Sequence, residues 1–543
     1  MSAARKRPRA SQSRAILALD LDCFYAQVAI RSRPHLANRP VVILQKHLCV
    51  TSNYVARRLA HGAVQKMTPV STALKACPDI VCIDGSDLTP FREANAEVLA
   101  VIRAWLHAKV TELGVGSFPI PCQKLGFDEV FIDVSRLVAE QVTAGGRPWE
   151  FQGHIFGRTD DDASRRALMV ASQLASELRK EITLRTKLTL CAGISESKLL
   201  AKLAVNMNKP NDQTIFLSGD AAQYIAGRHP RSLPGFGYAV EGKISAWAKR
   251  NGKEDIKTAA DVVQWFGDGK KGFASLAKVL DNDDQARKIL ELCQGTDTSP
   301  VIESGDAPKS LTSMDSFRSC TKIEDAERRV TIRAKDMVTR LRRDWELYGR
   351  RPKTLTVGFR FRGDGYHATM RAIPMPQEIV SLCSSKGADA ADRSIIALSR
   401  AALFVLKDHA GVSASSTFDM TLISIGASAF TENKTEKNAT STKKETVASF
   451  FAPKEGKGMS SVCRPPNGRL LQNRSSPNPR RPLSPNASFS RCPICNEVLS
   501  SLLAKASLHV DQCLRRSETV SPARKRSKTA SNTFRVDTFF QRK

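Results

Sequence analysis

Residues 14–22 read RAILALDLD, and residues 125–134 read LGFDEVFIDV. Each is an apolar run of strand length that contains carboxylates, so each predicts a buried β-strand with acidic residues at or near its end. A carboxylate in such a strand loses hydration at a cost that a positive partner must offset. A divalent metal such as Mg²⁺, which prefers oxygen ligands, is the simplest partner. Together the two stretches predict an acidic metal site.

The spacing of the carboxylates constrains this site. Asp20 and Asp22, two apart on a strand, face the same side, whereas the consecutive Asp128 and Glu129 would face opposite sides of a regular strand. Both could reach one site only at a turn or bulge, which Gly126 would permit. For either cluster alone, the alternative is a strand-end carboxylate that caps a turn.

The chain up to about residue 424 alternates helical and strand patterns without a steady βαβ rhythm, which predicts an α+β multidomain fold. The predicted helices cover residues 165–179, 197–205 and 334–348, and the predicted strands cover residues 188–194, 353–361 and 420–425. A tight glycine turn is predicted at residues 233–237 (LPGFG).

Length and charge limit the class of protein. The 543 residues suggest several domains, and 41% hydrophobic residues exclude a wholly disordered chain. A formal charge of +29 favours nucleic acid as a partner over anionic membranes, although Lys and Arg can also serve solubility alone. No apolar run approaches the ~20 residues that a membrane span needs. Thirteen mostly solitary cysteines indicate a reducing compartment inside the cell.

Two basic segments suit phosphate chemistry. Residues 54–58 (YVARR) and 208–210 (NKP) supply cations, with Arg offering a bidentate fork and Lys a point charge. Paired metal ions stabilise the attacking and leaving oxygens of phosphoryl transfer, and such chemistry needs these cations as well. Taken alone, either segment is more simply a solvated surface charge.

The composition changes near Ser424. Residues 427–543 hold 22 Lys and Arg against 8 Asp and Glu, with few apolar residues, so residues 427–490 are predicted to be a disordered linker. Beyond it a C-x2-C-x13-H-x3-C pattern predicts a structural Zn²⁺ site. Its ligands are Cys492, Cys495, His509 and Cys513.

The same part of the chain carries short linear motifs. Residues 447–451 (VASFF) and 536–540 (VDTFF) each place an aliphatic residue three before paired Phe, which suits a one-turn helix in an apolar groove. The basic runs at residues 5–9 and 524–528 predict import into the nucleus, or added nonspecific affinity for DNA.

Five motifs, taken in order, resemble the Y-family translesion DNA polymerases from about residue 15 to about residue 425. They are residues 19–28 (LDLDCFYAQV), 53–57 (NYVAR), 126–133 (GFDEVFID), 193–204 (GISESKLLAKLA) and 208–211 (NKPN). Three further stretches favour the iota branch over an eta- or kappa-like member: residues 124–129 (KLGFDE), 153–156 (GHIF) and 308–317 (PKS followed by DSF).

The resemblance implies a right-hand polymerase fold. Its expected parts are a basic N-terminal tail (1–14), palm (15–23 and 85–219), fingers (24–84), thumb with a glycine hairpin (220–305), little finger (306–426), the linker, a zinc finger (491–515) and a basic tail (516–543). In the little finger, charge for DNA would come from Arg318, Arg360, Arg362 and Arg371.

The resemblance also implies roles for individual residues. Asp20, Asp128 and Glu129, with the backbone carbonyl of Leu21, would hold two Mg²⁺ or Mn²⁺ ions, and Asp22 would support them. The primer 3′-oxygen would attack the α-phosphate of a deoxynucleoside triphosphate and release pyrophosphate. Tyr25 would be the steric gate against ribose, and the incoming triphosphate would contact Tyr54, Arg57 and Lys209.

In the tail, the zinc-ligand segment resembles ubiquitin-binding fingers, in which Asp511 would contact ubiquitin. The terminal motif resembles sliding-clamp-binding motifs, through Val536, Phe539 and Phe540. The whole predicts a nuclear translesion polymerase of low fidelity, acting on primer–template DNA and recruited by ubiquitin and the sliding clamp. The alternative of another class is a non-catalytic scaffold that keeps DNA and ubiquitin binding.

Overall fold

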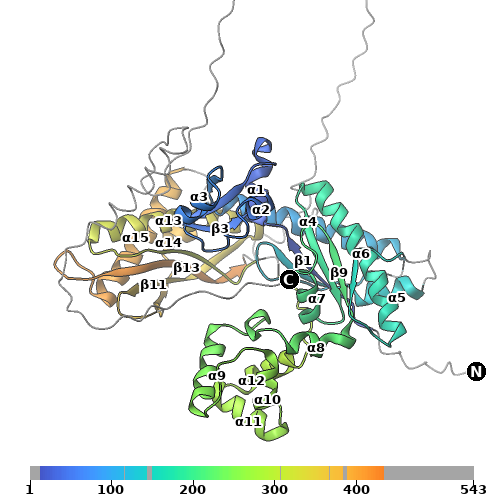
Figure 1. The fold of residues 1–543 in the computed structure, drawn as a ribbon. Coiled ribbons are helices and arrows are strands. Elements are labelled where there is room, and N and C mark those ends of the chain that lie inside the picture. The colour runs from blue at the N-terminus through green and yellow to red at the C-terminus, as the bar shows by residue number, and fades with distance from the viewer. Residues whose placement is uncertain are drawn as a thin grey trace, which may run out of the picture. The chain divides into compact units, whose positions relative to one another are not determined.

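The computed structural model describes residues 13–432, apart from residues 115, 144–149, 306, 366 and 383–387. The described chain divides after Ile302 into two compact units (Figure 1). No helix among the described residues is long and apolar enough to cross a membrane. The predicted zinc ligands, ubiquitin contact, paired-Phe motifs and basic runs lie outside the described residues.

The first unit is built on a six-stranded sheet with the order β5-β6-β1-β8-β9-β7. The strands are β1 (Ile16–Leu21), β5 (Cys122–Lys124), β6 (Glu129–Asp133), β7 (His154–Phe156), β8 (Leu190–Ser195) and β9 (Gln213–Phe216). Every residue of β1 is buried, because β1 lies between β6 and β8 and is covered on both faces.

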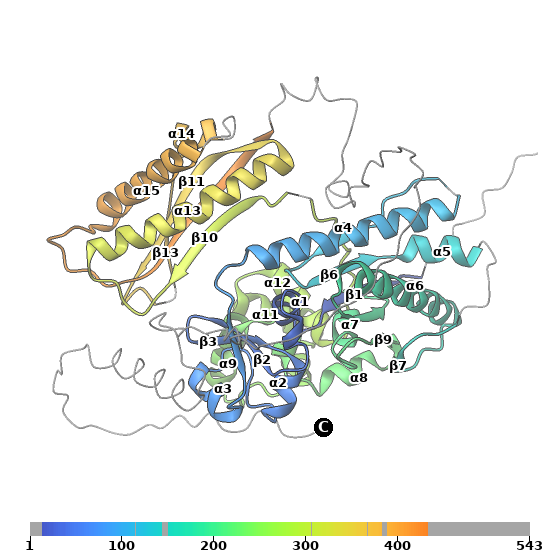
Figure 2. The ribbon, with the colours of Figure 1, turned by 90° about the horizontal axis from the view of Figure 1, so that it is seen from above.

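Helices cover the two faces of this sheet (Figure 2). Leu17 and Leu19 pack with α4 (Thr89–Glu112), α5 (Ser135–Thr143) and α6 (Asp162–Thr186). On the opposite face, Ile16 and Ala18 pack against Ala201 of α7 (Lys198–Ala204). This approach requires glycine at residue 193 of β8, because a Cβ there would lie 2.0 Å from the carbonyl oxygen of Ala201. The glycine therefore lets α7 lie directly against the strand that carries Asp20.

Residues 24–84 add a three-stranded sheet of order β3-β2-β4, made of β2 (Val41–Gln45), β3 (Leu48–Ser52) and β4 (Val81–Asp84). The helices here are α1 (Phe24–Arg31), α2 (Tyr54–Leu59) and α3 (Val70–Ala76). A core of its own, which includes Val42, Leu44 and Ala56, holds this sheet to α2 and α3.

A helical part completes the first unit. It contains α8 (Ala221–Ala226), α9 (Tyr238–Arg250), α10 (Ala259–Phe266), α11 (Gly269–Leu280) and α12 (Asp283–Cys293). Short 3-10 helices occur at Pro34–Leu36, Ser218–Asp220 and Pro230–Ser232. Phe236 of the predicted glycine turn is buried with Ile244 and Phe266, so the turn is anchored to the helical core.

The second unit is a four-stranded antiparallel sheet of order β10-β13-β11-β12 with helices packed on it. Its elements are β10 (Ser310–Ser316), α13 (Ile323–Tyr348), β11 (Arg350–Phe361), β12 (Thr369–Pro374), α14 (Gln377–Leu382), α15 (Ala388–Ala410) and β13 (Met420–Glu432). Leu355, Val357 and Phe359 of β11 alternate into the core, as the sequence pattern predicts.

The predicted α+β multidomain class is confirmed, although several elements extend beyond their expected bounds, two of them for a clear reason. The helix expected at 334–348 begins at Ile323, because Ala326 and Val330 continue its buried face between charged residues. Residues 427–432, assigned above to a disordered linker, belong instead to β13. Their backbone pairs with β11, as in Leu355 opposite Ala427 and Arg350 opposite Glu432, and this pairing outweighs the polar composition.

Candidate active site at the end of strand β1

The two acidic stretches meet at the end of β1. Asp20 lies directly opposite Glu129 in the antiparallel pairing of β1 with β6, so the two side chains share one face of the sheet. Asp128 lies in the bend before β6 and accepts a hydrogen bond at its backbone oxygen from the Leu21 N–H, at 2.9 Å. The bend after Gly126 removes the strict alternation of a strand, as the sequence argument required.

Electrostatics show that the three carboxylates are close. Burial raises the pKa of Asp128, and the negative charges of Asp20 and Glu129 raise this pKa further. Asp20 is itself buried, with 8% of its surface exposed. Like charges gathered in a partly desolvated place repel one another, so the cluster needs cations.

Two lysines supply positive charge. The Lys209 Nζ atom lies 2.5 Å from Asp20 Oδ1. The Lys202 Nζ atom lies 2.5 Å from Glu129 Oε1 and 3.4 Å from Asp20 Oδ2, so it bridges the two carboxylates. Lys202 was not among the predicted site residues, although it stands inside the quoted motif at residues 193–204. Its side chain reaches from α7 to Asp20 on β1 and Glu129 on β6.

As the side chains lie, no group of three or more His, Cys, Asp or Glu residues within the described ranges is arranged to hold a metal ion. The chemistry of the donor set nevertheless fits divalent cations. Asp20, Asp128 and Glu129 are hard oxygen ligands gathered around one strand end, where burial and then the charges of Asp20 and Glu129 raise the pKa of Asp128, and a cation would offset both effects.

Asp22 holds the surrounding elements together. It is 1% exposed, and its Oδ1 accepts hydrogen bonds from the Tyr54 hydroxyl at 3.1 Å and the Cys191 thiol at 3.3 Å. Its Oδ2 accepts from the Thr189 hydroxyl at 3.0 Å and the Asn211 N–H at 2.8 Å. Both oxygens are thus engaged by the protein, so Asp22 is suited to positioning rather than to binding a ligand.

Tyr25 lies beside the acidic cluster. Its ring is half-buried, with its centroid 4.4 Å from that of Phe91 and 6.3 Å from that of Phe127. Burial raises the pKa of the Tyr25 hydroxyl, and the charge of Asp128 raises it further. The ring therefore forms part of the wall next to the carboxylates.

Tyr54 and Arg57 come from α2. Asn53 caps this helix, since its side-chain oxygen accepts from the Ala56 N–H at 2.9 Å. The Arg57 guanidinium lies 4.8 Å from the centre of the Tyr54 ring, and its Nε donates to the Ser52 carbonyl at 3.1 Å. Arg57 is an exposed residue on the helix that Asp22 ties to the sheet.

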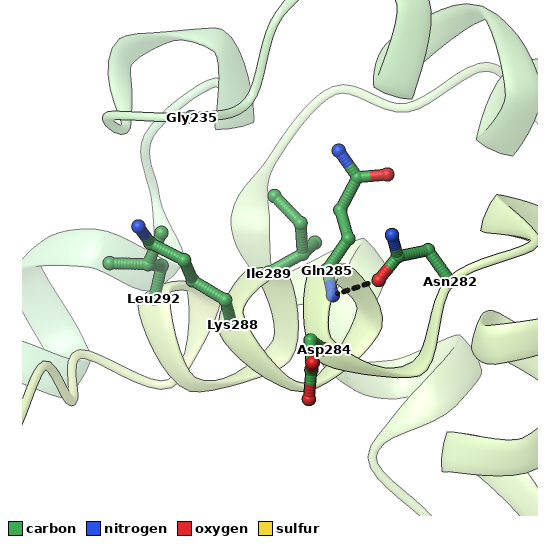
Figure 3. Close-up of a pocket in the computed structure, with 7 residues that line it drawn as sticks. All are labelled: Gly235, Asn282, Asp284, Gln285, Lys288, Ile289 and Leu292. Atoms are coloured by element: carbon green, nitrogen blue, oxygen red, sulfur yellow. Dashed lines mark hydrogen bonds between the residues drawn. The ribbon is translucent and has the colours of Figure 1, made fainter. Parts of the chain in front are cut away.

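The predicted glycine turn lines a hollow of about 370 Å³ in the helical part of the first unit (Figure 3). Gly235, with a φ of 87°, lies across it from α12. Lys288 and Gln285 extend from α12, and Asn282 caps this helix by accepting from the Gln285 N–H at 2.8 Å. The positive φ explains the glycine, since other residues adopt that region at a cost.

The arginines predicted to contact DNA from the second unit lie at the end of its sheet or on its surface. Arg362 donates to Asp419 and to the carbonyl of Arg318, and Arg360 Nε donates to the Thr421 hydroxyl at 3.0 Å. Arg371 on β12 is exposed. These ion pairs and hydrogen bonds account for Arg360 and Arg362 without a ligand.

Comparison with known proteins identifies the part of the chain that carries the three carboxylates and Lys202. Residues 19–206 match the model of the impB/mucB/samB family. This segment is a Y-family domain. The family resemblance predicted from the five motifs is therefore confirmed, and the Y-family domain holds Asp20, Asp128, Glu129 and Lys202, while Lys209 follows three residues after the matched segment.

Relatives extend the match into the second unit. The chain is 32% identical to DNA polymerase iota of Mus musculus over 379 residues, which is 68% of this chain and 48% of that protein. It is 32% identical to DNA polymerase iota of Homo sapiens over 386 residues, 69% of this chain and 47% of that protein. DNA polymerase IV of Staphylococcus aureus (strain Newman) is 25% identical over 332 residues, 59% of this chain and 81% of that protein. The chain spans about half the length of these iota relatives.

Proposed function

We propose that this chain is a template-directed DNA polymerase that performs low-fidelity translesion synthesis, most like the iota branch. The observation that carries the proposal is the convergence of Asp20, Asp128 and Glu129 at the end of β1, next to Lys202 and Lys209. Relatives named as DNA polymerases support it. Carboxylates beside lysines suit a reaction in which cations and a polyphosphate are brought together.

Two Mg²⁺ or Mn²⁺ ions would be held by Asp20, Asp128, Glu129 and the Leu21 carbonyl. When bound, these ions would neutralise phosphate charge and polarise the reacting oxygens. The protein itself would position the reactants. Lys209, on the loop after α7, would exchange its contact with Asp20 for one with the incoming triphosphate. Catalysis would then depend on orientation and charge neutralisation, without a covalent intermediate.

The neighbouring residues would select and orient the nucleotide. Arg57 presents a guanidinium that can bind phosphate oxygens as a fork, and Tyr54 fixes the helix that carries it. Tyr25, half-buried against Phe91 and close to Asp128, would stand where a ribose 2′-hydroxyl would otherwise fit. The glycine turn and the arginines of the second unit would contact the DNA backbone without reading its sequence.

Recruitment is proposed from the sequence alone. Zn²⁺ on Cys492, Cys495, His509 and Cys513 would fold a finger that binds ubiquitin through Asp511, and Val536, Phe539 and Phe540 would bind the sliding clamp. The basic runs would direct the protein to the nucleus. The carboxylate cluster argues against the alternative of a non-catalytic scaffold, because a binding module gains nothing from clustered, partly buried carboxylates.

The test is single-nucleotide primer extension opposite each undamaged template base, comparing wild type with Asp128→Ala/Glu129→Ala. We expect metal-dependent extension that the double variant loses, while its affinity for primer–template DNA stays nearly unchanged. Glu254→Ala/Asp255→Ala, which removes two exposed carboxylates from a loop, is the matched control and should keep full activity.

The possible outcomes test the site, the scaffold alternative and the branch in turn. Extension retained by the Asp128/Glu129 variant would refute the site. Absence of extension by wild type with any base or metal, together with tight DNA binding, would favour the scaffold. Poor fidelity opposite template T would favour the iota branch over an eta- or kappa-like one.

A further inference from the structure

Lys202 and Lys209 contact the same acidic cluster in different ways. Lys209 touches one carboxylate from a loop, whereas Lys202 bridges Asp20 and Glu129 from a helix. The Lys202 side chain is 21% exposed and the Asp20 side chain 11%, so the bridge is partly shielded from water. Such shielding strengthens an ion pair relative to one on the open surface.

The backbone of α7 fixes the place of Lys202. Ala201, next to it in the chain, packs on Ile16 and Ala18 of β1, and the absence of a side chain at Gly193 lets the helix lie against β8. Ser197 caps the helix, with its Oγ accepting from the Leu200 N–H at 3.2 Å. Lys202 therefore cannot move away with its helix, and only rotation of its own side chain can withdraw the ammonium group from Glu129.

The charges at the site show what this contact does. Three carboxylates face two ammonium groups, so most of the negative charge that would attract a divalent cation is already neutralised. A cation that uses Asp20 and Glu129 as ligands needs the same oxygen atoms that Lys202 holds. It also meets the repulsion of an ammonium group a few ångströms away.

We propose that Lys202 is a built-in competitor of the divalent cation. It neutralises Asp20 and Glu129, and its ammonium must leave Glu129 before a cation can bind there. This lowers the affinity for cations in the absence of nucleotide, and it restrains the protein from loading metal before a triphosphate brings further negative charge. The inference rests on the proposed function, since it takes the cluster to be the metal site.

The test measures Mn²⁺ binding to the full chain without DNA or nucleotide, from the loss of the electron paramagnetic resonance signal of free Mn²⁺. Lys202→Met should bind Mn²⁺ roughly fivefold more tightly than wild type, which corresponds to about 1 kcal/mol. Lys202→Arg keeps the charge and should bind like wild type. Lys198→Met is the matched control, because it removes the same charge from the same helix. The Lys198 ammonium donates hydrogen bonds to the Pro300 carbonyl and the Gln123 side chain instead of contacting the carboxylates.

A purely structural role for Lys202 would weaken Mn²⁺ binding or leave it unchanged in Lys202→Met, and either result would overturn the proposal. Lys202→Gln, which keeps a polar side chain of similar reach, replaces Lys202→Met if that variant does not fold, and the same tightening is expected. Asp128→Ala/Glu129→Ala should abolish the site. If Mn²⁺ binding survived this double change, the metal site itself would be overturned. If the double change abolished Mn²⁺ binding but Lys202→Met did not tighten it, only the role of Lys202 would be overturned.

Discussion

The Tyr54 hydroxyl donates a hydrogen bond to Asp22 Oδ1 over 3.1 Å, and this contact joins two parts of the first unit that lie far apart in the sequence. Tyr54 begins α2, while Asp22 directly follows β1. Since the same carboxylate accepts from Thr189 and Asn211, it fixes α2 relative to the sheet that carries Asp20. The proposed nucleotide contacts therefore depend on a buried acid that need not touch the nucleotide.

Tyr54→Phe should lower the midpoint of thermal unfolding of the metal-free protein, because it removes a donor to a buried carboxylate. We expect a loss of about 1–2 kcal/mol in the free energy of unfolding, measured by chemical denaturation. Tyr238→Phe is the control, since Tyr238 is 75% exposed and its ring packs on Arg231. Equal effects of the two changes would contradict a special role for the contact between Tyr54 and Asp22.

Asp128→Asn should stabilise the metal-free protein at neutral pH. Burial and the charges of Asp20 and Glu129 raise the pKa of Asp128 in the fold, so ionised Asp128 costs stability above its ordinary pKa. Below that pKa the carboxyl is protonated in both the folded and the unfolded chain, and the cost vanishes. The stability gain of the variant over wild type, followed by thermal unfolding across pH 3 to 8, should therefore shrink as the pH falls. A gain that is independent of pH would contradict the electrostatic cause.

Gly193→Ala should destabilise the first unit by about 3 kcal/mol or more, because the new Cβ would lie 2.0 Å from the carbonyl oxygen of Ala201 and 2.5 Å from the Val205 nitrogen. Both neighbours are backbone atoms, one in α7 and one in the residue that follows it, so the whole helix must shift. Gly242→Ala, in α9 with nothing near its Cβ position, should instead be neutral or stabilising by up to about 1 kcal/mol. Chemical denaturation of both variants checks the contrast, and a mild effect at residue 193 would show that α7 can move.

Arg350→Met should destabilise the second unit by about 3–5 kcal/mol, because it leaves Asp344 buried without its partner. The guanidinium donates two hydrogen bonds of 2.8 Å to the Asp344 carboxylate, whose side chain is 4% exposed. Adding Asp344→Leu to Arg350→Met should recover most of the loss, since no buried charge then remains.

The exposed pair of Arg287 with Asp284 provides the control for this change. Arg287→Met should alter the free energy of unfolding by less than about 0.5 kcal/mol, because both side chains are largely in water. Thermal unfolding of the three variants separates the cases. If Arg350→Met were as mild as Arg287→Met, the buried pair would contribute nothing to the fold.

The sequence allowed β1, the acidic pair after Gly126 and the α+β class to be predicted, because each follows from local pattern. Lys202 could not be found in this way: composition indicates a helix at 197–205 but does not say which of its faces meets β1. That choice depends on the close approach at Gly193, which is a property of packing. The role of Asp22 likewise depends on donors as distant in sequence as Thr189 and Asn211.

The full extent of β13 could not be predicted from the sequence for a related reason. Residues 427–432 look like part of a polar tail, yet they form the last part of β13 because β11 supplies their hydrogen-bond partners. Periodicity detects a strand through its own side chains, whereas backbone pairing with another strand leaves no signal in the paired segment.

The place of β13 also bears on how the second unit is made during translation. The strand lies between β10 and β11, although it is the last of the four to be synthesised. Until it leaves the ribosome, β10 has no neighbour within the sheet and β11 pairs on one side only. Until β13 is added, the nascent unit therefore exposes two strand edges that the completed sheet covers, one of β10 and one of β11, and in this state a chain most readily associates with others or requires a chaperone.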